Sequence, residues 1–201
     1  MSKKDSATED LIKETAKRIF FAEGRFNATT QEIADAAGVN RTLVHYYFRS
    51  KDQLFKKVME DGRSEFHKKM EEMDHPELSF KQKMKHLINI WMEQGLKYPF
   101  LDSYLLSQII DPKELDSLIE EGKHPDNEKI EGFLKEIKKE MKAGNIVTMN
   151  PVHFLLNMAS LISYPIIMRP LLERTLPVTK KEFDTIMADR EAVILKTLFL
   201  K

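Results

Sequence analysis

Cysteine is absent from the 201-residue sequence, which excludes disulfides, thiolate nucleophiles and cysteine metal ligands and fits a reducing compartment. Proline is absent before Pro76, and all eight prolines lie between Pro76 and Pro177. The sequence also has no net charge, because 32 Lys and Arg balance 32 Asp and Glu. A nucleic-acid partner therefore has to be inferred from local features rather than from overall charge.

The sequence lacks an apolar run long enough to cross a membrane. Its N-terminus, MSKKDSATED, has no apolar core of a secretion signal, and polar residues and a proline interrupt the longest apolar stretch, residues 154–168. We therefore expect a cytoplasmic protein without a membrane partner. The 42% apolar and 32% charged residues are typical of globular proteins, and the length suits one or two domains.

The periodicity of apolar residues predicts an all-α fold. No stretch sustains the alternation of a strand, whereas apolar residues recur at helical intervals. Capping boxes at Ser6, Thr29 and Ser50 predict three helix starts, and Gly24 is predicted to end the first helix. Beyond residue 78 we expect helices at 79–97, 100–110, 112–121, 126–143, 151–168 and 179–199, with residues 169–172 in a connection. We divide the chain into an N-terminal domain of residues 1–59 and a second helical domain of residues 60–201.

Residues 29–54 predict two short helices joined by a tight turn. Thr29 caps the first helix, Gly38 supplies the positive φ of the turn, and Asn40 caps a helix from Arg41 to Phe48. If Val44 and Phe48 face the core, the opposite face carries hydrogen-bond donors: Arg41, Thr42, His45, Tyr46 and Arg49.

The donor face of this second helix has two interpretations. An isolated Arg or Tyr on a helix is usually solvated surface. Two exposed aromatics on one short helix need a further reason. Arg, Thr, His and Tyr can bond base edges, so the arrangement fits helix-turn-helix docking in the major groove. Phosphate contacts would come from Thr30 and Gln31 at one helix start and from Lys51 at another.

The motif around this turn resembles the N-terminal signature of TetR-family transcriptional regulators. The resemblance covers about residues 8–60 and is carried by Thr29-Thr30-x-x-Ile33-Ala34-x-x-Ala37-Gly38-Val39 followed by Tyr47-Phe48-x-Ser50-Lys51-x-x-Leu54. It implies an all-α homodimer on a palindromic double-stranded operator, with an inducer pocket in the C-terminal domain. By motif position it implies DNA contacts from Thr30, Gln31, Arg41, Thr42, His45, Tyr46, Tyr47 and Lys51. His45 stands where the family most often has Tyr.

Aromatic and methionine side chains are frequent in the C-terminal part, and most are interpreted as core. The functional hypothesis is an apolar cavity lined by Trp91, Tyr104, Phe154 and Met158, with Asn157 or Tyr164 orienting an apolar or aromatic inducer of unknown identity. The helices at 151–168 and 179–199 are expected to pair with their two-fold mates in a four-helix dimer interface. Burial within one subunit is the alternative.

Catalysis finds no support in the sequence. The histidines show no metal-ligand spacing, and there is no glycine-rich phosphate loop or Gly-x-Ser-x-Gly motif. We predict no catalytic residue, no metal site, no cofactor and no enzymatic activity. The leading hypothesis is a ligand-responsive repressor. The alternatives are an activator or architectural DNA-binding protein without an inducer, and a helical small-molecule carrier or protein-interaction module.

Overall fold

The computed structural model describes residues 3–71, 77–109 and 127–200, and no strand occurs within these ranges. The all-α prediction is therefore confirmed. The described residues form two compact units. The first contains residues 3–71 and 97–101, and the second contains residues 77–96, 102–109 and 127–200.

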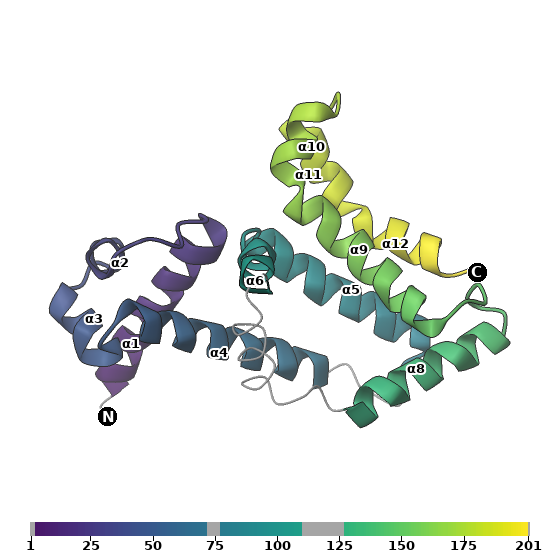
Figure 1. Cartoon of the computed structure of the whole chain (residues 1–201), viewed down its shortest axis with the longest axis horizontal. Helices are drawn as coiled ribbons and strands as arrows, with labels where there is room; N and C mark the ends of the chain where they lie inside the picture. The colour runs from purple at the N-terminus through teal and green to yellow at the C-terminus, as the bar shows by residue number, and fades with distance from the viewer. Residues whose placement is uncertain (1–2, 72–76, 110–126, 201) are drawn as a thin grey trace. The chain divides into compact units, whose positions relative to one another are not determined.

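The first unit is a small helical bundle, drawn in purple and blue in Figure 1. Its elements in chain order are α1 (Lys3–Lys17), the π-helix η1 (Arg18–Ala22), α2 (Thr30–Ala37), α3 (Arg41–Phe48) and α4 (Lys51–Glu71). Helix α1 packs against α2 and α4, and α2 packs against α3. The buried side chains that hold these helices together include Ile12, Ala16, Ile19, Phe20, Ile33, Ala34, Val44, Leu54 and Val58.

Helix α1 differs from its prediction at its start and continues into η1. It begins at Lys3 rather than at Ser6, whose hydroxyl donates to Asp10 inside the helix at 3.5 Å, so the first predicted cap is wrong. In η1 the Glu23 N–H donates to the Arg18 carbonyl at 3.0 Å, across five residues. This wider turn buries Ile19, Phe20 and Phe21 in succession, and Gly24 follows with φ +70° as predicted.

Ion pairs join α1 to α4 inside the first unit. The Lys13 ammonium lies 2.6 Å from an Asp61 oxygen, and the Lys17 ammonium lies 2.8 Å from a Glu65 oxygen. Burial would raise the pKa of Asp61, but the hydrogen bond and charge of Lys13 lower it below its ordinary value. Because residues 13 and 17, and residues 61 and 65, are four apart, both contacts lie along one seam between the helices.

Residues 97–101 pack against the end of α1 and η1. The Phe100 N–H donates to the Phe21 carbonyl at 3.0 Å, and the Lys17 ammonium lies 5.0 Å from the centre of the Tyr98 ring. A Cβ atom built on Gly24 would lie 3.0 Å from the Phe100 ring. The absent side chain of Gly24 therefore makes room for this aromatic contact.

The second unit contains the helices drawn in teal, green and yellow in Figure 1, and the rings of Phe80, Phe133, Phe154 and Phe199 contact one another inside it. Its elements are α5 (Phe80–Lys97, with Lys97 in the first unit), α6 (Leu101–Ile109), α8 (Asn127–Lys142), α9 (Pro151–Ile167), α10 (Arg169–Thr175), α11 (Lys180–Ala188) and α12 (Arg190–Leu198). The predicted helices at 79–97, 100–110, 126–143 and 151–168 are confirmed to within one residue at each end. The predicted helix at 112–121 lies outside the described residues. Helix α9 packs against α8, α10 and α12.

The prediction of one helix over 179–199 is wrong, because the helix breaks at Asp189. Helix α12 starts with Arg190, whose Nε and Nη2 donate to the Leu161 carbonyl at 3.2 and 3.1 Å. Within α9 that carbonyl would accept from residue 165, but Pro165 has no N–H. Arg190 thus replaces the helical hydrogen bond that Pro165 removes, and this contact ties the start of α12 to α9.

The connection expected at residues 169–172 is also wrong, because it is part of helix α10. Arg169 pairs with Glu173 at 2.8 Å and with Asp184 of α11. Its guanidinium lies 5.3 Å from the centre of the Phe183 ring, also on α11. Arg169 therefore connects α10 to α11 through charge and aromatic contact.

Among the described residues, no single helix has both the length and the apolar composition needed to cross a membrane. Only the pair α9 and α10, taken together, meets that test, and the two helices are bent by 69° relative to each other.

Candidate nucleic-acid interface

The start of α2 is fixed by a complete capping box. The Glu32 N–H donates to the Thr29 hydroxyl at 3.2 Å, and the Thr29 N–H donates to a Glu32 carboxylate oxygen at 2.8 Å. The backbone hydrogen bond from Thr29, followed by that from its hydroxyl, lowers the pKa of the Glu32 carboxyl. The Arg25 guanidinium lies 2.5 Å from the same carboxylate group and adds to this effect. The prediction from the sequence is confirmed here.

The turn between α2 and α3 also follows the sequence prediction. Gly38 has φ +66°, and the Val39 N–H donates to the Ala34 carbonyl at 3.0 Å, which closes the end of α2. The Asn40 side chain accepts from the Thr42 N–H at 2.8 Å and so caps α3. The two helices are joined by only three residues, which fixes the angle at which α3 leaves α2.

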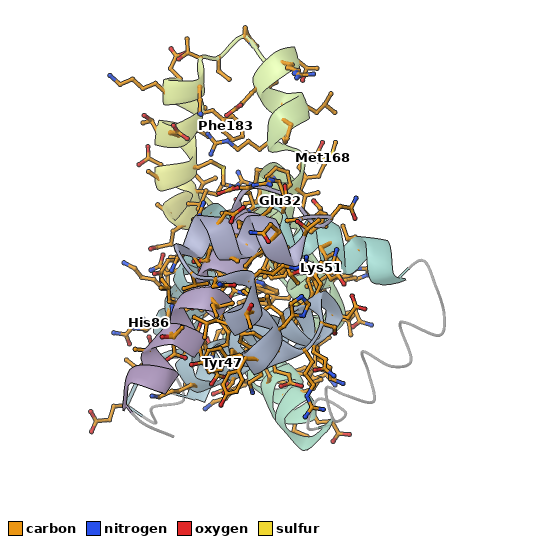
Figure 2. All side chains as sticks on the ribbon, turned by 90° about the vertical axis from the view of Figure 1, so that its left-hand side faces the viewer. Glu32, Tyr47, Lys51, His86, Met168 and Phe183 are labelled. Atoms are coloured by element: carbon orange, nitrogen blue, oxygen red, sulfur yellow. The ribbon has the colours of Figure 1, made fainter. Side chains whose placement is uncertain are left out.

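Helix α3 has one buried face and one exposed face. Val44 and Phe48 are buried in the first unit, while the side chains of the other face are exposed to solvent. The exposed side chains of α3 are Arg41, Thr42, Leu43, His45 and Tyr46. Tyr46 is 75% exposed, and its ring meets that of Tyr47 edge-on at a centroid distance of 5.1 Å. Tyr47, labelled in Figure 2, is half-buried and also lies against Phe48.

The three remaining predicted DNA contacts differ in exposure. Thr30 is buried, so its side chain belongs to the core rather than to the exposed face. Gln31 is exposed, and its amide donates to Asp35 at 2.7 Å. Lys51, labelled in Figure 2, is half-buried and donates to the Phe26 carbonyl at 3.2 Å. An ammonium has three donors, so this hydrogen bond leaves Lys51 further bonding capacity.

The arginines at the ends of α3 differ from many basic side chains of the first unit in having no ion-pair partner within the part of the chain that the structure describes. Several basic side chains of the first unit pair with carboxylates: Lys13, Lys17, Arg18, Arg25 and Lys57. Arg41 and Arg49 make no ion pair with any residue of the described ranges. Exposed guanidinium groups without carboxylate partners retain all their donors for guanine or phosphate oxygens. Arg41 and Arg49, at the two ends of α3, therefore keep positive charge available to a partner, although the sequence as a whole is neutral.

The chain makes an unusual turn at the end of α3 that the sequence does not predict. Arg49 has φ +55° and ψ −42°, and the Ser50 N–H lies 2.5 Å from the Phe48 carbonyl oxygen. These values describe a γ-turn centred on a non-glycine residue, which is rare and strained. The sequence carries no signal for it, because glycine or asparagine is the usual sign of a positive φ.

The predicted ligand-pocket residues fall into two groups. Phe154 and Met158 are buried on α9. The centre of the Phe154 ring lies 6.0 Å from that of Phe80 and 6.1 Å from that of Phe199. Trp91 on α5 and Tyr104 on α6 are half-buried. Asn157 and the 57% exposed Tyr164 lie on the solvent side of α9, away from Phe154 and Met158.

A polar group of the second unit was not anticipated from the sequence. Burial raises the pKa of the Asp102 carboxyl on α6, and a hydrogen bond with Ser163 of α9 lowers it in part. A carboxyl partly withdrawn from water is a candidate for orienting a ligand. The sequence gives no sign of this partial burial, because aspartate usually lies at the protein surface.

Comparison with known families identifies the N-terminal motif. The model of the tetR family of bacterial regulatory proteins matches residues 12–58, which include the capping box, the Gly38 turn and α3. Residues 12–58 therefore form a DNA-binding domain of the type found in the tetR family. This match covers the helix-turn-helix and describes it as part of bacterial regulatory proteins. No curated protein matches the sequence.

Solved structures extend the likeness in fold beyond residues 12–58 to nearly the full length of the chain. A fatty acid degradation regulator, FadR from Bacillus halodurans, aligns with a TM-score of 0.60 at 14% identity over 93% of this chain and 94% of its own. A candidate fatty acid metabolism regulator from Clostridium perfringens aligns with a TM-score of 0.59 at 22% identity, over 95% and 100%. A TetR family transcription regulator from Marinobacter aquaeolei aligns with a TM-score of 0.61 at 13% identity, over 99% of each chain. At these identities the likeness concerns the helical fold.

Proposed function

We propose that this chain is a tetR-family repressor that binds a palindromic operator as a homodimer and is released by a small apolar or aromatic ligand. The observation that carries the DNA-binding part is the exposed face of α3, where Arg41 and Arg49 have no carboxylate partner. In a helix-turn-helix the second helix enters the major groove, and an unpaired guanidinium there can bond guanine bidentately.

The residues proposed to contact DNA have different roles. Arg41, Thr42, His45 and Tyr46 would contact base edges because they are exposed on one side of α3. The phosphate contacts would come from Gln31, Tyr47, Lys51 and the backbone N–H groups at the start of α2, where Thr30 contributes its main chain. The functional boundary is proposed to lie within α4 near residue 59, so that one helix belongs to the DNA-binding part and continues beyond it.

Binding of DNA from upstream of the regulator's own gene tests the role of α3. The double variant Arg41→Ala plus Tyr46→Ala should lose the sharp gel-shift complex, since each base contact contributes about 1–3 kcal/mol of discrimination. The charge-matched control is Arg174→Ala, which removes an exposed arginine of α10. A complex that survives the α3 changes would remove α3 from its proposed role.

The dimer proposal is supported by an apolar face that one chain leaves exposed. Val152, Leu156 and Tyr164 are 48%, 55% and 57% exposed and lie four and eight residues apart on α9, which places them on one side of the helix. Ile186 on α11 and Val193 on α12 are each 48% exposed. A second copy of the chain would cover this face in an isologous helical interface. Tyr164 then serves the dimer rather than the ligand.

Sedimentation measures the dimer directly. Leu156→Glu places a charge in the proposed interface and should convert a dimer into a monomer at micromolar concentration. Val147→Glu is the matched control, because Val147 is 49% exposed but lies outside the helices of the proposed face. Equal dimerisation of both variants would place the interface elsewhere.

The ligand proposal relies on the aromatic interior of the second unit. Trp91, Tyr104, Phe154 and Met158 would contact an apolar molecule, and Asp102 would orient a hydrogen-bond donor on it. Because two solved structures of similar fold are described as regulators of fatty acid degradation and metabolism, fatty acids join simple aromatics in the test panel. An inducer should quench Trp91 and dissociate the DNA complex. If no compound did either, the inducer proposal would be abandoned.

A further inference from the structure

His45 is held by the backbone at the end of its own helix. Its ring Nδ1 lies 3.1 Å from the Arg49 carbonyl oxygen. A carbonyl oxygen has no hydrogen to donate, so Nδ1 must carry the proton of this hydrogen bond. Neutral imidazole has one N–H, and the other nitrogen, Nε2, then presents a lone pair. The contact therefore fixes both the tautomer and the orientation of an exposed ring.

The γ-turn at Arg49 creates the carbonyl that holds this ring. In a continuing helix, carbonyl groups point along the axis toward the C-terminus, away from side chains of the preceding turn. The positive φ of Arg49 takes its carbonyl out of that alignment, while the Arg49 N–H still donates to the His45 carbonyl at 2.9 Å. Two hydrogen bonds thus join residues 45 and 49, and Nε2 has no partner among the described residues.

We propose that His45 recognises its base through Nε2 as a hydrogen-bond acceptor and so selects an exocyclic amino group, N6 of adenine or N4 of cytosine. This inference rests on the proposed DNA-binding role of α3. In the major groove, adenine and cytosine offer amino donors, whereas guanine and thymine offer acceptors at O6 and O4. Arg41 is a donor only and selects guanine. The two side chains of one helix face therefore recognise opposite kinds of base.

Selection from a pool of randomised duplexes tests this assignment. Wild type should prefer adenine or cytosine at one position of each half-site, on the order of tenfold over guanine or thymine. His45→Ala should lose that preference alone. His45→Lys, which supplies only donors, should transfer the preference to guanine or thymine.

His45→Asn separates the two roles of the ring. The asparagine amide nitrogen can occupy the place of Nδ1 and donate to the Arg49 carbonyl, but nothing replaces Nε2. This variant should keep the helicity of wild type and should still lose the preference. Replacing the selected adenine by purine, which lacks N6, should weaken wild type on the order of tenfold and leave His45→Asn unchanged.

Three results would overturn the inference. The first is that wild type prefers guanine or thymine at the half-site position where His45→Ala loses its base preference. His45→Ala could weaken all sequences equally, which would indicate a phosphate contact. The third result is that His45→Ala alters the base preference at no position, while Arg41→Ala alters it at one. In that case the proposed function stands, and only the role of His45 is refuted. If wild type enriches no sequence, the proposed function falls together with this inference.

Discussion

The hydrogen bonds from Arg190 to the Leu161 carbonyl predict a measurable coupling between Arg190 and Pro165. Arg190→Met keeps the length of the side chain and removes both donors, which lie 3.2 and 3.1 Å from the carbonyl oxygen. Since Pro165 cannot supply the helical hydrogen bond, that oxygen loses its partner. The loss of a charged donor should lower the free energy of unfolding by about 1.5–3 kcal/mol.

Pro165→Ala supplies the matched background. It restores an N–H four residues after Leu161, so the carbonyl can accept within α9 and no longer depends on Arg190. In this background Arg190→Met should cost less than about 1 kcal/mol. The double-mutant cycle should therefore give a coupling energy of about 1–2 kcal/mol.

Urea unfolding followed by Trp91 fluorescence measures this cycle, because Trp91 is the one tryptophan of the sequence and belongs to the same unit as both residues. All four proteins are compared at one protein concentration, since association would shift the midpoints. Equal costs of Arg190→Met in both backgrounds, within about 0.5 kcal/mol, would refute the reasoning. The Leu161 carbonyl would then not be the group through which Arg190 stabilises the fold.

Further predictions concern the first unit and are measured by hydrogen exchange of peptides from α1 to α4. Gly24→Ala and Gly38→Ala both place alanine at positive φ, but only Gly24 faces an aromatic ring, that of Phe100. Gly24→Ala should therefore lower the free energy of unfolding by about 1–3 kcal/mol more than Gly38→Ala. Equal losses would show that the Phe100 contact does not restrict residue 24. Asn40→Ala should weaken α3 by about 1 kcal/mol, and unchanged exchange would deny the cap. Arg49→Gly should raise the free energy of unfolding of the first unit by about 1 kcal/mol, whereas Arg49→Ala should not raise it. Equal stabilities of the two variants would show that the γ-turn is not strained. Because the pKa of Glu32 is lowered in the folded protein, its carboxylate contributes fully to stability above pH 4.5, and this contribution is lost as the pH falls through the lowered pKa. The stability of Glu32→Gln should therefore fall less with acid than that of wild type. Parallel curves of stability against pH for the two proteins would contradict this.

The sequence predicted the DNA-binding motif well because its determinants are local. Thr29 and Glu32 bond each other across three residues, and Asn40 bonds the N–H two residues later. Gly38 is required by the backbone angle of its own turn. Each of these features depends on residue types at fixed short spacing, so a reader of the sequence alone can place the caps and the turn.

Other features depend on residues distant in the sequence. The break at Asp189 accompanies a hydrogen bond between Arg190 and Leu161, 29 residues apart. The burial of Thr30 and the half-buried environment of Asp102 follow from helix packing. Tyr164 and Phe154 share one apolar helix, and the packing of α9 against its neighbours α8, α10 and α12 decides which of the two side chains faces solvent. The local pattern predicted helix at each of these positions, but it did not reveal the distant residues that each helix contacts.

Methylation protection of guanine N7 most directly tests the central claim that α3 enters the major groove. Guanine N7 lies in that groove, so bound protein should protect guanines in two half-sites whose centres are about 34 Å, or one helical turn, apart. The protections should disappear in Arg41→Ala plus Tyr46→Ala and persist in Arg174→Ala. A retained DNA complex without major-groove protection, or the same protection in the α3 variant, would contradict the account.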